Sequence, residues 1–137
     1  MYVLRGPAST IDPMLPTSQF TFVTQDGLIA NLPPDQWPID RTVFTLNGQL
    51  YLVHSGWPAG TDGLEQQLFI AKMTNLYTAD ASAGILLIAK ATFPWEKYQD
   101  PGNGPLHQIN EGPAWLEIDA FKGIVFSGER VGPVTTK

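Results

Sequence analysis

Residues 42–54 read Thr-Val-Phe-Thr-Leu-Asn-Gly-Gln-Leu-Tyr-Leu-Val-His, two apolar runs joined by Asn47 and Gly48. β-Branched and aromatic side chains favour strands, and Asn-Gly suits a type I′ turn, in which both central residues have a positive φ. The stretch therefore predicts a β-hairpin. A second hairpin is predicted where residues 118–123, which contain Asp119, Lys122 and Gly123, separate the apolar runs 114–116 and 124–126.

Other short runs of β-branched and aromatic residues have the length of a strand: 2–4, 20–24, 68–73, 85–89 and 124–127. Pro33 and Pro34 and the Pro/Gly-rich segment 101–105 separate such runs as turns or loops. No stretch of ten or more residues has a clean helical period. The sequence therefore predicts one all-β domain over residues 1–137.

The two hairpins lie in similar sequence frames. Asp40 precedes Ser55 by 15 residues, Glu111 precedes Ser127 by 16, and each serine is followed by glycine. Each copy reads carboxylate, apolar strand, polar turn, apolar strand, Ser-Gly, and the copies are about 71 residues apart. Such a repeat is typical of propeller blades, whose innermost strands converge on the central channel. The two carboxylates are therefore expected to meet at one end of that channel.

Paired carboxylates in a pocket with aromatic walls suit glycoside cleavage. One acid protonates the leaving oxygen, and a second carboxylate activates water or attacks the sugar. Trp37, Trp57 and Trp95 lie beside proline in loop-like contexts where a ring could face a sugar. Trp115 lies inside an apolar run and is expected in the core. Isolated acidic residues such as Asp40 are more often turn formers or caps, so spacing alone leaves both interpretations open.

Composition excludes several functions. The formal net charge is −5 and the eight Lys and Arg residues are scattered, which argues against nucleic-acid binding. The longest apolar stretch, 84–89, is too short to span a membrane, and the first residues show no signal-peptide pattern, so localisation stays open. With no cysteine, and no third ligand beside His54 or His107, no metal or cofactor is predicted. Nucleotide-binding and serine-hydrolase motifs are absent from the sequence.

Five ordered motifs resemble signatures of family 43 glycoside hydrolases. Residues 37–44 read Trp-Pro-Ile-Asp-Arg-Thr-Val-Phe, and residues 47–57 read Asn-Gly-Gln-Leu-Tyr-Leu-Val-His-Ser-Gly-Trp. Residues 67–73, 92–96 and 109–113 follow as Gln-Leu-Phe-Ile-Ala-Lys-Met, Thr-Phe-Pro-Trp-Glu and Ile-Asn-Glu-Gly-Pro. The resemblance implies a β-propeller fragment, about two blades of a five-bladed propeller.

The resemblance also implies an activity, the inverting cleavage of O-glycosyl bonds in arabinose- or xylose-containing plant polysaccharides, with α-L-arabinofuranosidase as the parent activity. Glu111 matches the family's acid, and Asp40 matches the carboxylate that tunes and orients that acid. The implied substrate contacts are Trp37, Ile39, Trp57, Trp95 and Asn110.

The resemblance places the family's Asp base on the blade before Asp40. That blade is expected to be missing, because residues 1–4 resemble the strand that follows the base motif, and Asp12 matches a surface loop. Catalysis by this chain is therefore expected to be impaired. Arg41 stands where the family commonly has glycine, and His54 where it has an aromatic residue. A cation at Arg41 would favour the ionised form of Asp40 and fill space meant for sugar.

Two other functions remain open. In a non-catalytic or vestigial carbohydrate-binding module, the tryptophans would remain as platforms while the chemistry is lost. A WD-repeat scaffold fits least well, because no Trp-Asp dipeptide occurs and the repeat exceeds the roughly 40–45 residues of such blades. An incomplete propeller leaves strand edges uncovered, so self-association is also expected.

Overall fold

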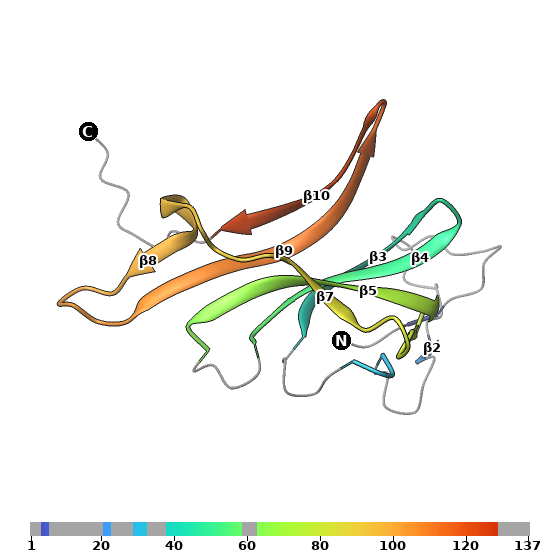
Figure 1. The fold of residues 1–137 in the computed structure, drawn as a ribbon, viewed down its shortest axis with the longest axis horizontal. Coiled ribbons are helices and arrows are strands. Elements are labelled where there is room, and N and C mark those ends of the chain that lie inside the picture. Colours follow the sequence, from blue (N-terminus) through green and yellow to red (C-terminus); the bar gives the residue numbers. More distant parts are fainter. Residues whose placement is uncertain (1–3, 6–20, 23–28, 33–37, 59–62, 129–137) are drawn as a thin grey trace.

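The computed structural model describes residues 4–5, 21–22, 29–32, 38–58 and 63–128. The elements in chain order are β1 (Leu4–Arg5), β2 (Thr21–Phe22), β3 (Ile39–Leu46), β4 (Gln49–Gly56), β5 (Glu65–Asn75), β6 (Thr78–Ala79), β7 (Ile85–Ala89), the 3₁₀ turn η2 (Pro94–Glu96), β8 (Lys97–Gln99), β9 (Leu106–Ile118) and β10 (Phe121–Gly128) (Figure 1). The all-β prediction is confirmed. Within these ranges, no helix has the length and apolar character needed to cross a membrane.

The centre of the fold is a four-stranded antiparallel sheet in the order β3-β4-β5-β7. β6 pairs with the far end of β5, and β1 and β2 form a separate ladder. Four antiparallel strands are the unit of a propeller blade. The sheet is one such blade, and the chain folds as a β-propeller fragment.

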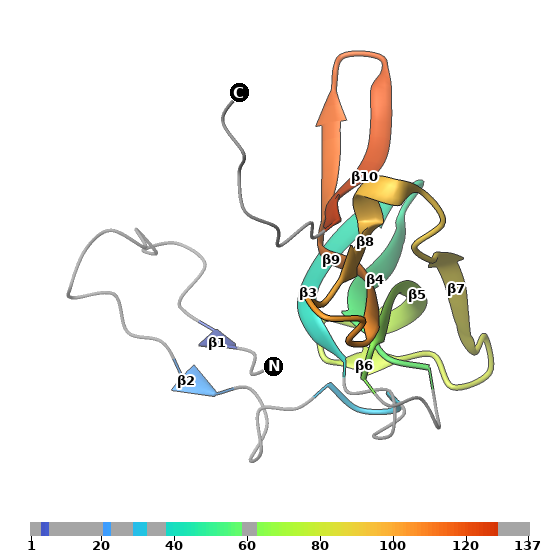
Figure 2. The same cartoon turned by 90° about the vertical axis from the view of Figure 1, so that its left-hand side faces the viewer.

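The hairpin of β9 and β10 lies beside this blade (Figures 1 and 2). β9 pairs in parallel with the start of β5, through the pairs Glu65↔Gln108 and Gln66↔Ile109. It also pairs antiparallel with β8. Further along, Trp115 of β9 stacks on Phe44 of β3, with ring centroids 4.4 Å apart and planes 2° from parallel. Trp115 is half-buried between the two hairpins, in agreement with the packing role expected for it.

The two hairpins have the same strand register, 72 residues apart. The pairs Leu46↔Gln49, Phe44↔Tyr51 and Ile39↔Ser55 of the first correspond to Ile118↔Phe121, Leu116↔Gly123 and Glu111↔Ser127 of the second. Positive φ angles recur at the same interval, in three pairs of equivalent residues. The angles are 64° at Asn31 and 62° at Asn103 in the first pair, 48° at Asp40 and 60° at Gly112 in the second, and 51° at Asn47 and 52° at Asp119 in the third. The repeat is therefore 72 residues, not about 71. Glu111 is the counterpart of Ile39, and Asp40 is the counterpart of Gly112.

The first turn agrees with its prediction, since φ is 51° at Asn47 and 76° at Gly48. The second turn is tighter than residues 118–123, because Phe121 already pairs with Ile118. Gly123 belongs to β10, where a Cβ would lie 2.8 Å from the ring of Phe121. The missing side chain thus leaves room for that ring beside the turn.

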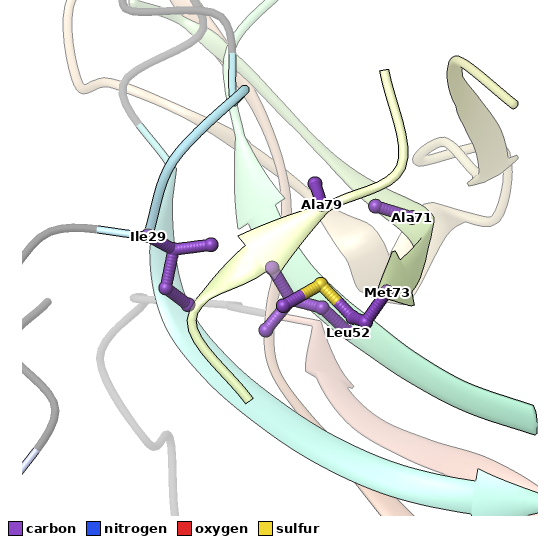
Figure 3. Close-up of a cluster of buried hydrophobic side chains, with 5 residues drawn as sticks. All are labelled: Ile29, Leu52, Ala71, Met73 and Ala79. Atoms are coloured by element: carbon purple, nitrogen blue, oxygen red, sulfur yellow. The ribbon is translucent and has the colours of Figure 1, made fainter. Parts of the chain in front are cut away.

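The apolar core lies on the face of the blade that points away from β9. Leu52 of β4 and Ala71 and Met73 of β5 are buried there against Ile29 and Ala79 (Figure 3). These three strand residues share one face because Leu52 pairs with Ala71, and Met73 is two positions further on. The opposite face carries Phe44 and meets β9, so β4 is covered on both faces.

Candidate functional site

Both candidate carboxylates lie at a β-bulge in an inner strand. In β3, Asp40 and Arg41 together lie opposite His54, and in β9, Gly112 and Pro113 lie opposite Phe126. The first bulge residue has a positive φ in each strand, 48° at Asp40 and 60° at Gly112, as in a bulge that normally takes glycine. Asp40 is thus a non-glycine residue in a strained conformation, a feature that clusters at functional sites.

Ser55 holds the carboxylate of Asp40. The buried Ser55 Oγ donates a hydrogen bond to Asp40 Oδ2 at 2.9 Å, while Asp40 itself is exposed. Ser55 lies on the same face of β4 as Tyr51, which pairs with Phe44. Because Phe44 stacks on Trp115, this is the face that β9 covers. The Asp40 carboxylate is therefore held on the face of the blade that β9 covers.

Glu111 lies beside the bulge of β9 that corresponds to the bulge at Asp40. It is half-buried, pairs with Ser127 and immediately precedes the bulge at Gly112. β3 and β9 both run from this end toward their hairpin turns (Figure 1). The structure thus places Asp40 and Glu111 at the equivalent bulges of β3 and β9, one position apart in the repeat.

We expect Gly112→Ala to lower the free energy of unfolding by about 1–2 kcal/mol, because its φ is 60°. An added Cβ would make only an ordinary contact, 3.6 Å from Ser127 Oγ, so the cost comes from the backbone. Gly112→Asn should cost less despite its larger side chain, since asparagine tolerates this conformation better. Urea denaturation measures both, and a larger loss for Asn than for Ala would contradict the strain explanation.

The charge of Arg41 acts on His54. Burial lowers the pKa of His54, its hydrogen bond to the Ser55 carbonyl opposes this, and the nearby Arg41 lowers the pKa further. Burial also lowers the pKa of Arg41. His54 and Ser55 are successive strand residues, so their side chains point to opposite faces. Arg41 therefore acts across the strand from the Asp40 carboxylate, and within the described ranges the two form no ion pair. The effect of Arg41 on Asp40 stays a prediction.

Several buried polar atoms near the bulges have no hydrogen-bond partner: Nε and Nη1 of Arg41, Nε2 of His54, Nε2 of Gln66 and both amide atoms of Asn110. Each such atom costs about 1–3 kcal/mol. Asn110 has an exposed fraction of 0%, so a sugar contact at Asn110 would require the site to open. Its assignment as a substrate contact stays a prediction.

Trp95 lies on the η2 turn beside the end of β10. The buried carboxylate of Glu96 fixes this turn, since its Oε2 accepts hydrogen bonds from the backbone N–H groups of Thr92 and Phe93, both at 2.6 Å. Trp95 is 49% exposed and stacks on Phe93 at 5.9 Å. A Cβ on Gly128 would lie 2.5 Å from the Trp95 ring. Because Gly128 pairs with Asn110, the ring lies at the end of the hairpin that carries Glu111.

The other predicted contacts differ in their surroundings. Trp57 is half-buried, and its Nε1 donates to the Gly63 carbonyl at 2.7 Å. Ile39 is half-buried at the start of β3. Trp37 lies outside the described residues.

His107 Nε2 lies 3.1 Å from Asp100 Oδ2, and the part of the chain that is described contains no group of three or more His, Asp or Glu residues suited to a metal.

Sequence reasoning did not assign a role to Ser55, Gly112 or Gly128. Ser55 holds Asp40, Gly112 permits the bulge beside Glu111, and Gly128 makes room for Trp95. The available signal was the Ser-Gly pair that closes each copy of the repeat. The pairing of the two strands in each hairpin places Ser55 opposite Ile39, within hydrogen-bond distance of Asp40, and Ser127 opposite Glu111.

No protein-family model and no curated protein matches the sequence. Among solved structures, the chain is similar to the alpha-L-arabinofuranosidase from Lactobacillus brevis, with a TM-score of 0.61 and 24% sequence identity. The similarity covers 80% of this chain and 30% of the other chain. This chain therefore spans less than a third of the length of that protein, and at this identity the likeness concerns the fold.

Proposed function

We propose that this chain is part of a glycoside hydrolase that acts on arabinose- or xylose-containing polysaccharides, with cleavage of α-L-arabinofuranosyl linkages as its activity. The observation that carries the proposal is the placement of Asp40 and Glu111 at bulges of adjacent inner strands. The fold shared with a solved alpha-L-arabinofuranosidase supports the choice of sugar. The placement of the two carboxylates and the shared fold both agree with the order of the five motifs in residues 37–113.

In the proposed mechanism, Glu111 is the general acid that protonates the departing glycosidic oxygen. Asp40 is the second carboxylate, which orients the acid and the sugar, and the Ser55 hydroxyl holds Asp40 in position. Inverting cleavage also needs a base that activates water. The proposal assigns no base among the described residues, so turnover should be reduced by the roughly 10²–10⁴-fold that such a group supplies.

The second candidate is a carbohydrate-binding protein without catalysis, which the exposure of Trp95 favours. Its ring is 49% exposed and is supported by Phe93 and Gly128 at the Glu111 end of the hairpin. A flat aromatic ring of this kind offers an apolar platform to a sugar. Both candidates predict sugar binding, and only the hydrolase predicts turnover.

We expect Trp95→Ala to weaken the binding of an arabinan oligosaccharide by about tenfold, or roughly 1.4 kcal/mol, because the platform is lost. Phe121→Ala is the matched control, since Phe121 is 54% exposed near the hairpin turn, away from the site. Titration calorimetry measures both variants. Equal losses in the two variants, or no loss with Trp95→Ala, would contradict the platform.

An assay with an aryl α-L-arabinofuranoside separates the two functions. Slow release of the aryl group by the unaltered chain, together with saccharide binding, supports the hydrolase. Binding with no release supports the carbohydrate-binding protein. If the chain neither binds nor cleaves the sugar, both assignments are wrong.

A further inference from the structure

Gln66 of β5 is a buried side chain with an unused hydrogen-bond donor. It is 5% exposed, and its Nε2 is buried with no hydrogen-bond partner in the part of the chain that the structure describes. Its neighbour Gln67 is equally buried, at 6%, yet its Nε2 donates to Glu65 Oε1 at 2.6 Å. A buried donor without an acceptor destabilises the folded state. The fold itself therefore gains nothing from the unused N–H of Gln66.

The strand register puts Gln66 on the same face of the blade as the Asp40 carboxylate. Leu68 pairs with Ser55, and Gln66 is two positions from Leu68, so the side chains of Gln66 and Ser55 share one face. Diagonal neighbours of this kind lie roughly 7–8 Å apart, within the reach of a long side chain. Ser55 is the residue whose hydroxyl donates to Asp40. Gln67 points to the opposite face, because successive strand residues alternate.

Gln66 also lies where β9 meets the blade. It pairs with Ile109 of β9, and Glu111 is two positions further along, on the same side of that strand as Ile109. Gln66 therefore has the two candidate carboxylates on neighbouring strands. On one side, β4 carries the serine that holds Asp40, and on the other, β9 carries Glu111.

We propose that Gln66 binds the substrate, with its Nε2–H group donating a hydrogen bond to a hydroxyl oxygen of the arabinose- or xylose-containing saccharide. The inference rests on the proposed function and names a further residue of the same site. A neutral amide suits a neutral sugar, because a hydroxyl oxygen accepts a hydrogen bond without a charged partner. The saccharide thus supplies the acceptor that the free chain lacks.

Rotation of the Gln66 side chain brings its amide to the sugar, since Nε2 is buried in the free chain. Nε2 has no partner to lose, so the rotation breaks no hydrogen bond at that atom. Rotation of Gln67 would break its bond to Glu65. Of these two neighbouring glutamines, Gln66 therefore has the amide that is available to a ligand.

Substitution by methionine separates a substrate contact from a structural role. Methionine is a similarly long, unbranched residue without a donor. Gln66→Met should raise the midpoint of urea denaturation, because a buried unpaired N–H group is removed. It should also weaken the binding of an arabinan oligosaccharide by about tenfold, as expected for the loss of one hydrogen bond to the ligand. A glutamine with a purely structural role would not combine these two changes.

Gln67→Met is the matched control, since Gln67 is the adjacent, equally buried glutamine on the opposite face. It should lower the urea midpoint, because its bond to Glu65 is lost, and leave the affinity for the saccharide unchanged. Gln66→Leu serves as a second variant in case methionine does not pack at Gln66. Urea denaturation and titration calorimetry measure all four proteins.

Two results would overturn the inference and leave the proposed function standing. In the first, both Gln66 variants lose stability as Gln67→Met does, which would mean that the Gln66 amide supports the fold. In the second, both bind the saccharide as tightly as the unaltered chain. If the unaltered chain binds no arabinan oligosaccharide, the proposed function and this inference are both wrong.

Discussion

At pH 7, the His54→Phe variant is expected to have a free energy of unfolding up to about 2 kcal/mol higher than that of the unaltered chain, because removal of the buried unpaired Nε2 outweighs loss of the Nδ1 hydrogen bond to the Ser55 carbonyl. His54 has an exposed fraction of 0%, and its Nε2 is buried without a hydrogen-bond partner. Phenylalanine removes this unpaired atom and can keep the ring packing against Phe69, 5.4 Å away. His54→Leu serves as a second variant in case the larger ring of phenylalanine does not fit.

The same substitution should change how stability depends on pH. Burial, which is the largest cause, and Arg41 lower the pKa of His54 below its ordinary 6.5. As the pH falls below about 6.5, the unfolded chain therefore binds a proton that the folded chain does not. As the pH falls, the free energy of unfolding of the unaltered chain should decrease by up to about 1.4 kcal/mol per pH unit relative to the variants. The decrease ends below the pKa of His54 in the folded state.

Urea denaturation at pH 5, 6 and 7, at a fixed protein concentration, measures this difference. Titration of the carboxylates is common to all three proteins, so the difference between the unaltered chain and each variant isolates His54. If both variants keep the pH slope of the unaltered chain, His54 does not titrate as its burial and the charge of Arg41 indicate.

The strands with strong local patterns were predicted correctly. The apolar run 85–89 coincides with β7, and Asn47-Gly48 forms the expected turn. β6 and β8 were not predicted, because they have only two and three residues. The first half of β9 was also missed, since its polar residues are held as a strand by pairing with β5 and β8, contacts between segments that lie apart in the sequence.

The candidate site could be predicted as a list of residues but not as an arrangement. Motif order indicated Asp40 and Glu111, but each copy contains an extra residue in the inner strand, the bulge, which a count along the sequence cannot detect. The bulge lies at the same place in both copies, and Asp40 is its first residue whereas Glu111 comes one position before it. It also decides that Asp40 contacts Ser55 while the charge of Arg41 acts on His54.

The second large effect is expected from Glu111→Gln, which should reduce the hydrolysis of an alkyl α-L-arabinofuranoside by about 10²–10⁴-fold. Glutamine keeps the size of the side chain but has no proton to give to the leaving oxygen. Glu117→Gln is the matched control on the same strand, since Glu117 is exposed near the turn and paired with Lys122. The control should retain the activity of the unaltered chain.

The role of Glu111 as an acid also predicts a dependence on the leaving group. An alkyl arabinofuranoside needs protonation of its oxygen, whereas a dinitrophenyl group leaves readily without it. Glu111→Gln should therefore lose most activity on the alkyl substrate and little on the dinitrophenyl substrate. A uniform loss on both substrates would indicate a role in binding or folding instead.

The most direct test of the account is the initial rate of alkyl α-L-arabinofuranoside hydrolysis by the unaltered chain, Glu111→Gln and Glu117→Gln, side by side. We expect slow turnover that Glu111→Gln lowers by about 10²–10⁴-fold and Glu117→Gln preserves. Turnover that persists in Glu111→Gln would contradict the assignment of Glu111 as the acid.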